Sequence, residues 1–230
     1  HVENISMVIE EALKKAELDM PDIDAVAFTQ GPGLVGCLHI GVQAAKTLAW
    51  AFDKPLVPVH HIAGHIYANR FLTDLAFPLL ALVVSGGHTE LVYMKDEWSF
   101  QILGTTQDDA IGEAGDKVGR VLGLPYPGGV YVDKLAKEGK PIYTLSKPKT
   151  EQALDFSFSG LKSSVLQFID RQKRQGLEFN AADLAASYQE TALDALLLRA
   201  RKALTQYQPK QMLLAGGVAA NSRLREKIQE

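Results

Sequence analysis

Three histidines stand close together in the run His60-His61-Ile62-Ala63-Gly64-His65. On a helix, His61 and His65 share one face because they are four residues apart. Two imidazoles at this spacing are a common metal-binding pair, and with carboxylate and substrate oxygens they suit Fe(II) or Zn. Ile62 stands where a zinc protease of the His-Glu-x-x-His type has its glutamate, which disfavours that mechanism. Histidines without a metal are the alternative, but half of the chain's 6 histidines lie here, so a metal is favoured.

Paired glycines recur where predicted strands end or helices begin. They occur in Val84-Ser85-Gly86-Gly87-His88-Thr89, Pro127-Gly128-Gly129 and Leu214-Ala215-Gly216-Gly217. Without a Cβ, such residues let backbone N–H groups approach a phosphate, a carboxylate or a base. A single turn of this kind reads equally well as a plain hairpin. Several at strand ends favour an anionic or nucleotide ligand.

Polar residues near these glycines are candidates for contacts with a ribose or a phosphate. Asp116 and Asp133 could accept from ribose hydroxyls, Lys117 could face a phosphate, and Asn221 follows the last Gly-Gly pair. An acidic residue near a helix start is also explained by the helix dipole, and locally this reading of Asp116 is the stronger one.

Composition excludes several classes of protein. The chain has 230 residues, 47% hydrophobic and 22% charged, which is typical of a globular protein. Its apolar runs are shorter than the roughly 20 residues of a membrane span, and no signal-peptide pattern is present. Cys37 is the only cysteine, so no intrachain disulfide forms, and a reducing, cytoplasmic location is expected. The net charge of −3 excludes whole-chain attraction to nucleic acid.

The elements that would position these residues follow from hydrophobic periodicity. Residues 1–76 predict helices and buried strands in the order αβαβα, with parallel strands. From Phe77, three short strands at 79–84, 90–94 and 100–105 predict an antiparallel meander. Four helices, a strand at 212–215 and a helix over 218–229 follow. We therefore predict two domains, 1–76 and 77–230, in an α/β fold. The meander with later αβα units is typical of the two-lobe actin/sugar-kinase/Hsp70-like (ASKHA) architecture, with the first lobe truncated.

Taken together, six motifs closely resemble the TsaD family, formerly labelled glycoprotease or O-sialoglycoprotein endopeptidase. In order they are Thr29–Gly36, His60–His65, Ser85–Thr89, Gly112–Val118, Phe156–Lys162 and Gly216–Asn221. The resemblance implies an enzyme that transfers a threonylcarbamoyl group from threonylcarbamoyl-adenylate to N6 of adenosine 37 in tRNAs that read ANN codons. It implies that His61 and His65 bind the metal, Fe(II) with Zn as the alternative. The implied substrate-binding residues, around an adenylate or ATP, are Val84, Ser85, Gly86, Gly87, His88, Asp116, Gly129, Asp133 and Asn221. No catalytic acid or base is implied.

The chain departs from the family pattern at its ends and at two internal positions. It resembles a fragment without the family's opening strands and without its C-terminal segment, which carries a further metal-ligating aspartate. We therefore expect the fragment alone to bind metal weakly and to lack full activity. Gly115 and Val130 stand where the family usually has Phe and Pro, which affects local helix geometry.

Two other functions compete with this interpretation. A metal-dependent endopeptidase is disfavoured because no general base lies beside the histidine pair. A non-catalytic lobe resembling the TsaB paralogue is disfavoured because that paralogue lacks the pair.

The resemblance also implies partners, namely tRNA and the TsaB and TsaE proteins. Residues 134–174 hold nine Lys or Arg against four acids, which suits tRNA, although a solvated helix surface has the same pattern. The apolar faces of the first-lobe helices predict binding to TsaB or a homodimer through that lobe.

Overall fold

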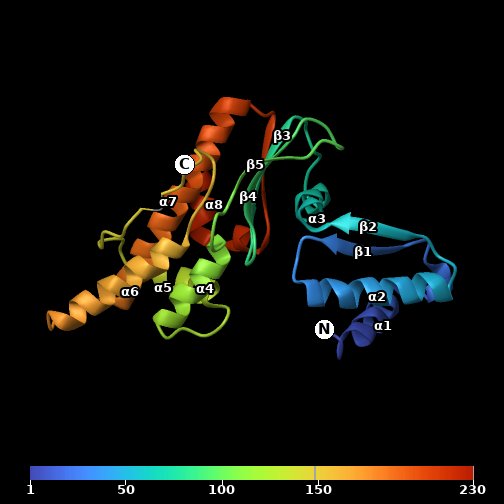
Figure 1. Ribbon diagram of the computed structural model, residues 1–230, viewed down its shortest axis with the longest axis horizontal. Coiled ribbons are helices and arrows are strands. Elements are labelled where there is room, and N and C mark those ends of the chain that lie inside the picture. The colour runs from blue at the N-terminus through green and yellow to red at the C-terminus, as the bar shows by residue number, and fades with distance from the viewer. Residues whose placement is uncertain (148, 230) are drawn as a thin grey trace. The chain divides into compact units, whose positions relative to one another are not determined.

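The computed structural model describes residues 1–147 and 149–229 and divides the chain into two compact units, His1–Tyr67 and Ala68–Glu230. Figure 1 shows the elements of both.

The first unit is a two-stranded parallel sheet with helical crossovers, as the apolar pattern predicts. Its elements are α1 (Ile5–Ala16), the short 3-10 turn η1 (Met20–Asp22), β1 (Val26–Gly31), α2 (Val35–Ala51), β2 (Leu56–His60) and α3 (His61–Tyr67). The strands β1 and β2 pair in parallel, with Val26 opposite Leu56. Both α2 and α3 pack on this sheet, and Ile62 and Ile66 of α3 are fully buried.

The division between the units falls after Tyr67, earlier than the sequence-based boundary near Phe77. The reason is a set of hydrogen bonds around Gln211 in the second unit. Its side-chain Oε1 accepts from the Ala76 N–H at 2.8 Å, and its Nε2 donates to the Asp74 carbonyl at 3.2 Å. These bonds attach the segment after Tyr67 to the last strand of the second unit.

The second unit is built on a four-stranded sheet in the order β5-β4-β3-β6. Its elements are η2 (Ala68–Phe71), β3 (Leu79–Val84), β4 (Thr89–Met94), β5 (Gln101–Thr105), α4 (Ile111–Val121), α5 (Gly128–Ala136), α6 (Ser159–Arg174), α7 (Ala181–Tyr207), β6 (Gln211–Ala215), η3 (Gly217–Ala220) and α8 (Ser222–Gln229). The strands β3, β4 and β5 form the predicted antiparallel meander, and β6 pairs in parallel with β3.

The core of the second unit lies between this sheet and the helices. Leu80, Leu82 and Val84 alternate along β3 and pack with α4, α5, α6 and α7. The long helix α7 contributes Leu184, Leu193 and further apolar residues to the same core. This packing holds the carboxyl ends of β3 and β6 next to α4 and η3.

The structure divides one predicted helix into two segments. A single helix over 218–229 is expected, but the structure has η3, an extended residue at Asn221 and then α8. Asn221 ends the first turn because its Oδ1 accepts from the Leu224 N–H at 2.8 Å, as a helix N-cap does. The interruption places the Asn221 side chain between two helical segments.

Among the described residues, no helix is both long enough and apolar enough to cross a membrane.

Asp108 joins the loop after β5 to the start of α6. Its carboxylate accepts from the Ser157 and Ser159 hydroxyls at 2.6 and 2.7 Å, and from the Phe158 and Ser159 N–H groups at 2.7 and 3.2 Å. Burial raises the pKa of the Asp108 carboxyl, but these hydrogen bonds outweigh burial and lower the pKa below its ordinary value. The ionised carboxylate is therefore the form that stabilises the fold.

We expect Asp108→Ala to lower the free energy of unfolding by about 2–3 kcal/mol, because hydrogen bonds to a charged group are lost. Since the folded pKa lies below the unfolded value of about 3.9, this stabilisation is complete above that pH and is lost as the pH falls through the folded value. Urea unfolding at pH 7 and at about pH 3 measures it. Asp108→Asn is the control because it cannot ionise. A difference between wild type and Asp108→Asn that stays constant with pH would contradict the charged role.

Candidate functional site

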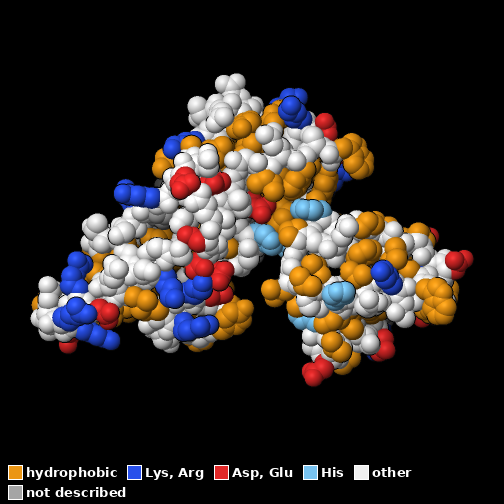
Figure 2. All heavy atoms as spheres, viewed as in Figure 1, with side chains coloured by type: hydrophobic (Ala, Val, Ile, Leu, Met, Phe, Trp, Pro, Cys, Tyr) orange, Lys and Arg blue, Asp and Glu red, His pale blue; other side chains and the backbone are white. Residues whose placement is uncertain are grey.

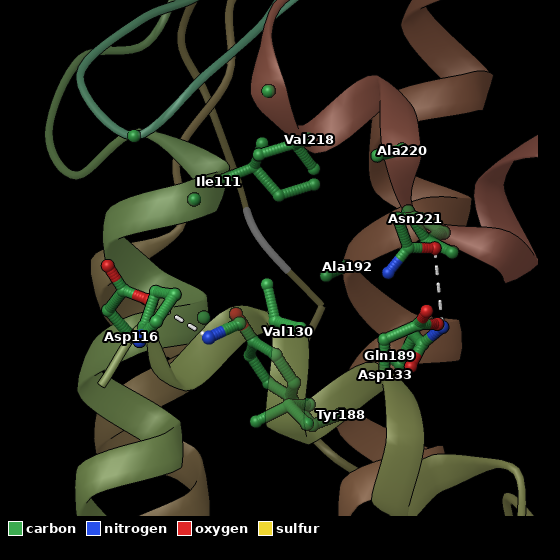
Figure 3. Close-up of a pocket in the computed structure, with 18 of the residues that line it drawn as sticks. Ile111, Asp116, Val130, Asp133, Tyr188, Gln189, Ala192, Val218, Ala220 and Asn221 are labelled. Atoms are coloured by element: carbon green, nitrogen blue, oxygen red, sulfur yellow. Dashed lines mark hydrogen bonds between the residues drawn. The ribbon is translucent and has the colours of Figure 1, made fainter. Parts of the chain in front are cut away.

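The second unit contains a pocket of about 410 Å³. Figure 3 shows it between α4, α5, α7 and the η3 segment. Its wall is mostly apolar with a few acid and amide side chains, which is typical of a small-molecule site. The lining residues are Gly86, Ile111, Gly112, Gly115, Asp116, Tyr126, Pro127, Gly129, Val130, Val132, Asp133, Tyr188, Gln189, Ala192, Leu193, Gly217, Val218, Ala220 and Asn221.

Two glycines are required by close backbone approach at the rim. A Cβ on Gly112 would lie 2.6 Å from the Ser85 carbonyl oxygen, so α4 approaches the β3–β4 turn closely only because this residue is glycine. Gly216 has φ +93°, and a Cβ there would lie 2.3 Å from the Val84 carbonyl oxygen. Gly217 is different, since a Cβ there would meet nothing within 4 Å.

Asp116 and Asp133 approach the pocket from α4 and α5. Asp116 Oδ1 accepts from the Gly129 N–H at 2.9 Å, which ties α4 to the first turn of α5. Asp133 accepts from the Ser222 hydroxyl at 3.0 Å, from the Ser222 N–H at 3.2 Å and from Gln189 Nε2 at 2.8 Å. The two carboxylates are thus held by donors from neighbouring elements.

The residues Tyr188 and Gln189 of α7 line the pocket and were missed by the sequence analysis. They are 3% and 6% exposed, and neither Tyr188 Oη nor Gln189 Oε1 has a hydrogen-bond partner among the described residues. Burial first, and then the charges of Asp116 and Asp109, raise the pKa of Tyr188, so it stays a neutral phenol. A buried polar atom without a hydrogen-bond partner costs about 1–3 kcal/mol and is rare in an ordinary protein core. These two atoms therefore distinguish the α7 wall of the pocket from ordinary core.

The predicted substrate-binding residues are only partly gathered at this pocket. Gly86, Asp116, Gly129, Asp133 and Asn221 line it. Val84 is a buried residue of β3, and Ser85, Gly87 and His88 are not among the lining residues. Instead, Ser85 and His88 close the β3–β4 turn, with the Ser85 N–H donating to the His88 carbonyl at 2.8 Å and the His88 N–H donating to Ser85 Oγ at 3.0 Å.

Lys117, which could face a phosphate, is not among the residues that line the pocket. Its ammonium group contacts Asp109 Oδ1 at 2.5 Å and Glu113 Oε1 at 2.9 Å. Hydrogen bonds from Lys117 to Asp109 and Glu113 raise the pKa of its ammonium group. Its charge is therefore balanced by these carboxylates, and Lys117 is absent from the pocket lining.

His61 and His65 lie one turn apart on α3 in the first unit. Their ring centroids are 4.6 Å apart in a T-shaped arrangement. Burial first, and then the charge of His61, lower the pKa of His65, which favours the neutral imidazole that metals bind. Within the described residues no group of three or more His, Cys, Asp or Glu is arranged to hold a metal ion.

Comparison with known structures shows the fold. The structure of HypF from T. kodakarensis is 16% identical in sequence and aligns with a TM-score of 0.67. The alignment covers 94% of this chain and 37% of the HypF chain. This likeness confirms the α/β, actin/sugar-kinase/Hsp70-like (ASKHA) fold.

Comparison with known sequences then identifies the family. The tRNA N6-adenosine threonylcarbamoyltransferase of Bacillus cereus is 58% identical over 231 residues, which is 100% of this chain and 67% of the relative. That of Listeria monocytogenes is 58% identical over 229 residues, with 99% of this chain and 67% of the relative covered. The TsaD family, tRNA N6-adenosine threonylcarbamoyltransferase, matches residues 1–230, and the chain belongs to this family. The predicted function, threonylcarbamoyl transfer to N6 of adenosine in tRNA, is thereby confirmed.

Proposed function

We propose that the pocket of the second unit binds the adenylate part of threonylcarbamoyl-adenylate, and that ATP and AMP compete for it. The observation that carries this proposal is the convergence of Asp116, Gly129, Asp133 and Asn221 on one pocket. The carboxylates suit ribose hydroxyls, and the apolar residues Ile111, Val130 and Val218 suit the faces of a base. Titration calorimetry with AMP tests the proposal, and a wild-type chain that does not bind AMP would overturn it.

In the same proposal, His61 and His65 hold the metal, Fe(II) with Zn as the alternative. When bound, the ion would polarise the carbamoyl carbonyl and so ease attack by the N6 amine with departure of AMP. The chain's own contribution is to present two imidazoles on one face of α3 and to hold the adenylate in the pocket. No side chain is proposed as an acid or base.

The double variant His61→Ala/His65→Ala is expected to lose metal, with an affinity for Fe(II) or Zn²⁺ at least about 100-fold weaker, because both proposed ligands are removed. Metal analysis after equilibrium dialysis measures the loss. His39→Ala is a matched control, since His39 is an exposed histidine on α2. Equal metal content in the double variant and the wild type would contradict the assignment.

The partner surfaces are assigned to different units. We place tRNA on the basic residues of 134–174, where Arg171, Lys173 and Arg174 end α6. Figure 2 shows Lys and Arg side chains gathered at that end of α6. We place TsaB binding, or a homodimer, on α1, which has no buried residue and leaves Met7 and Val8 65% and 59% exposed. We also propose TsaE as a partner protein and the cytoplasm as the location of the protein.

A further inference from the structure

The amide of Gln189 links two of the residues proposed to bind the adenylate. Its Nε2 donates to Asp133 Oδ1 at 2.8 Å and to Asn221 Oδ1 at 3.4 Å. Asp133 belongs to α5, Gln189 to α7, and Asn221 lies between η3 and α8. One side chain of α7 therefore connects two other elements at the wall of the pocket, as Figure 3 shows.

Chemistry fixes which way the Gln189 amide points. A carboxylate only accepts hydrogen bonds, so the amide nitrogen, and not the oxygen, must face Asp133. The opposite atom, Oε1, is left buried without a partner among the described residues. The contacts that hold Gln189 are thus those of its two N–H donors.

The same contacts fix the orientation of Asn221. Its Oδ1 accepts from Gln189 Nε2 and, at 2.8 Å, from the Leu224 N–H. With its oxygen occupied twice, the Asn221 amide presents its nitrogen to the pocket, and Figure 3 shows that nitrogen on the side of Asn221 that faces Ala192. The pocket wall then offers a donor at Asn221 and an acceptor at Asp133.

We propose that Gln189 is a positioning residue that sets this donor and acceptor pair, so that Asn221 donates to the bound adenylate while Asp133 accepts from its hydroxyls. The inference rests on the proposed adenylate site. Ser222 supports only one half of the pair, because its hydroxyl and its N–H both donate to Asp133. Gln189 is the side chain in contact with both members.

The test compares AMP binding by the wild type, Gln189→Met and Gln189→Glu. Methionine keeps the approximate shape but has no N–H donor, so we expect AMP binding about 10-fold to 100-fold weaker. Thermal melting shows whether each variant is folded. Gln206→Glu is the matched control, because it adds the same charge at an exposed position of the same helix.

The pH dependence of Gln189→Glu separates positioning from simple packing. An ionised glutamate repels Asp133, whereas a protonated glutamate can donate its single O–H to Asp133 and so restores that one of the two native contacts. AMP binding by this variant is therefore expected to be weak at pH 7.5 and to recover about 10-fold relative to wild type near pH 5. The wild type has the same other titratable groups in the two pockets that Gln189 lines, so the comparison is made relative to it: Asp116, Tyr126, Asp133, Lys137, Tyr188, Glu190, Arg223 and Glu226.

The outcomes are distinct. Failure of the wild type to bind AMP would overturn the adenylate site and this inference with it. AMP binding that Gln189→Met leaves unchanged, or a folded Gln189→Glu without recovery at low pH, would overturn the inference alone.

Discussion

Gly217→Val is expected to weaken AMP binding at least about 100-fold while leaving the chain folded. Gly217 lines the pocket, and a Cβ there would meet nothing within 4 Å, so the new side chain has room in the fold. We expect the ligand to occupy this empty space. A β-branched side chain at position 217 would keep the ligand from approaching the backbone closely. Titration calorimetry measures the loss, and thermal melting should show a change of only a few degrees.

The neighbouring glycine provides the contrast. Gly216 has φ +93°, and its Cβ would lie 2.3 Å from the Val84 carbonyl oxygen, so Gly216→Ala should destabilise the fold by roughly 2–4 kcal/mol. Urea unfolding distinguishes the two variants, because one should lose ligand binding and the other stability. Unchanged AMP affinity in a folded Gly217→Val would place the ligand elsewhere.

The fold was largely predictable because its strands and helices have strong periodic patterns. The predicted meander agrees with β3, β4 and β5 within one residue at each end, since these are short apolar runs bounded by turns. The αβαβα order of the first unit likewise follows from its apolar spacing. What local pattern could not predict was the break at Asn221, which depends on one side-chain cap, and the end of the first unit, which depends on the distant Gln211.

The residues of the candidate site that the sequence indicated are glycines and the polar residues near them, Asp116, Asp133 and Asn221. Gly86, Gly129 and the turn before Asn221 line the pocket as expected. Tyr188 and Gln189 were missed because α7 is mostly buried and gives one continuous helical pattern, in which polar residues on the pocket side carry no local signal. Lys117 pairs with Glu113 four residues earlier on α4, a spacing visible in the sequence, whereas its contact with Asp109 depends on the geometry of the helix start.

Reversing three charges near and on α6 is expected to weaken tRNA binding strongly. Lys149, Arg171 and Lys173 are exposed and belong to the segment with an excess of positive charge. Each lost phosphate contact should reduce the slope of log affinity against log salt concentration by about 0.7–0.9, so Lys149→Glu/Arg171→Glu/Lys173→Glu should flatten it by roughly 2. At low salt the affinity should fall at least about 100-fold, as filter binding over a salt series would measure.

Val8→Glu is the complementary change, on the surface assigned to protein partners. Val8 is 59% exposed on α1, so a glutamate there should disturb an apolar contact without disturbing the core. Self-association or TsaB binding, followed by analytical ultracentrifugation, should weaken about 10-fold or more, while the tRNA salt slope stays at its wild-type value. The α6 variant should do the reverse. If both changes weakened the same interaction, one surface would serve both partners, and the assignment of tRNA and protein partners to separate units would be wrong.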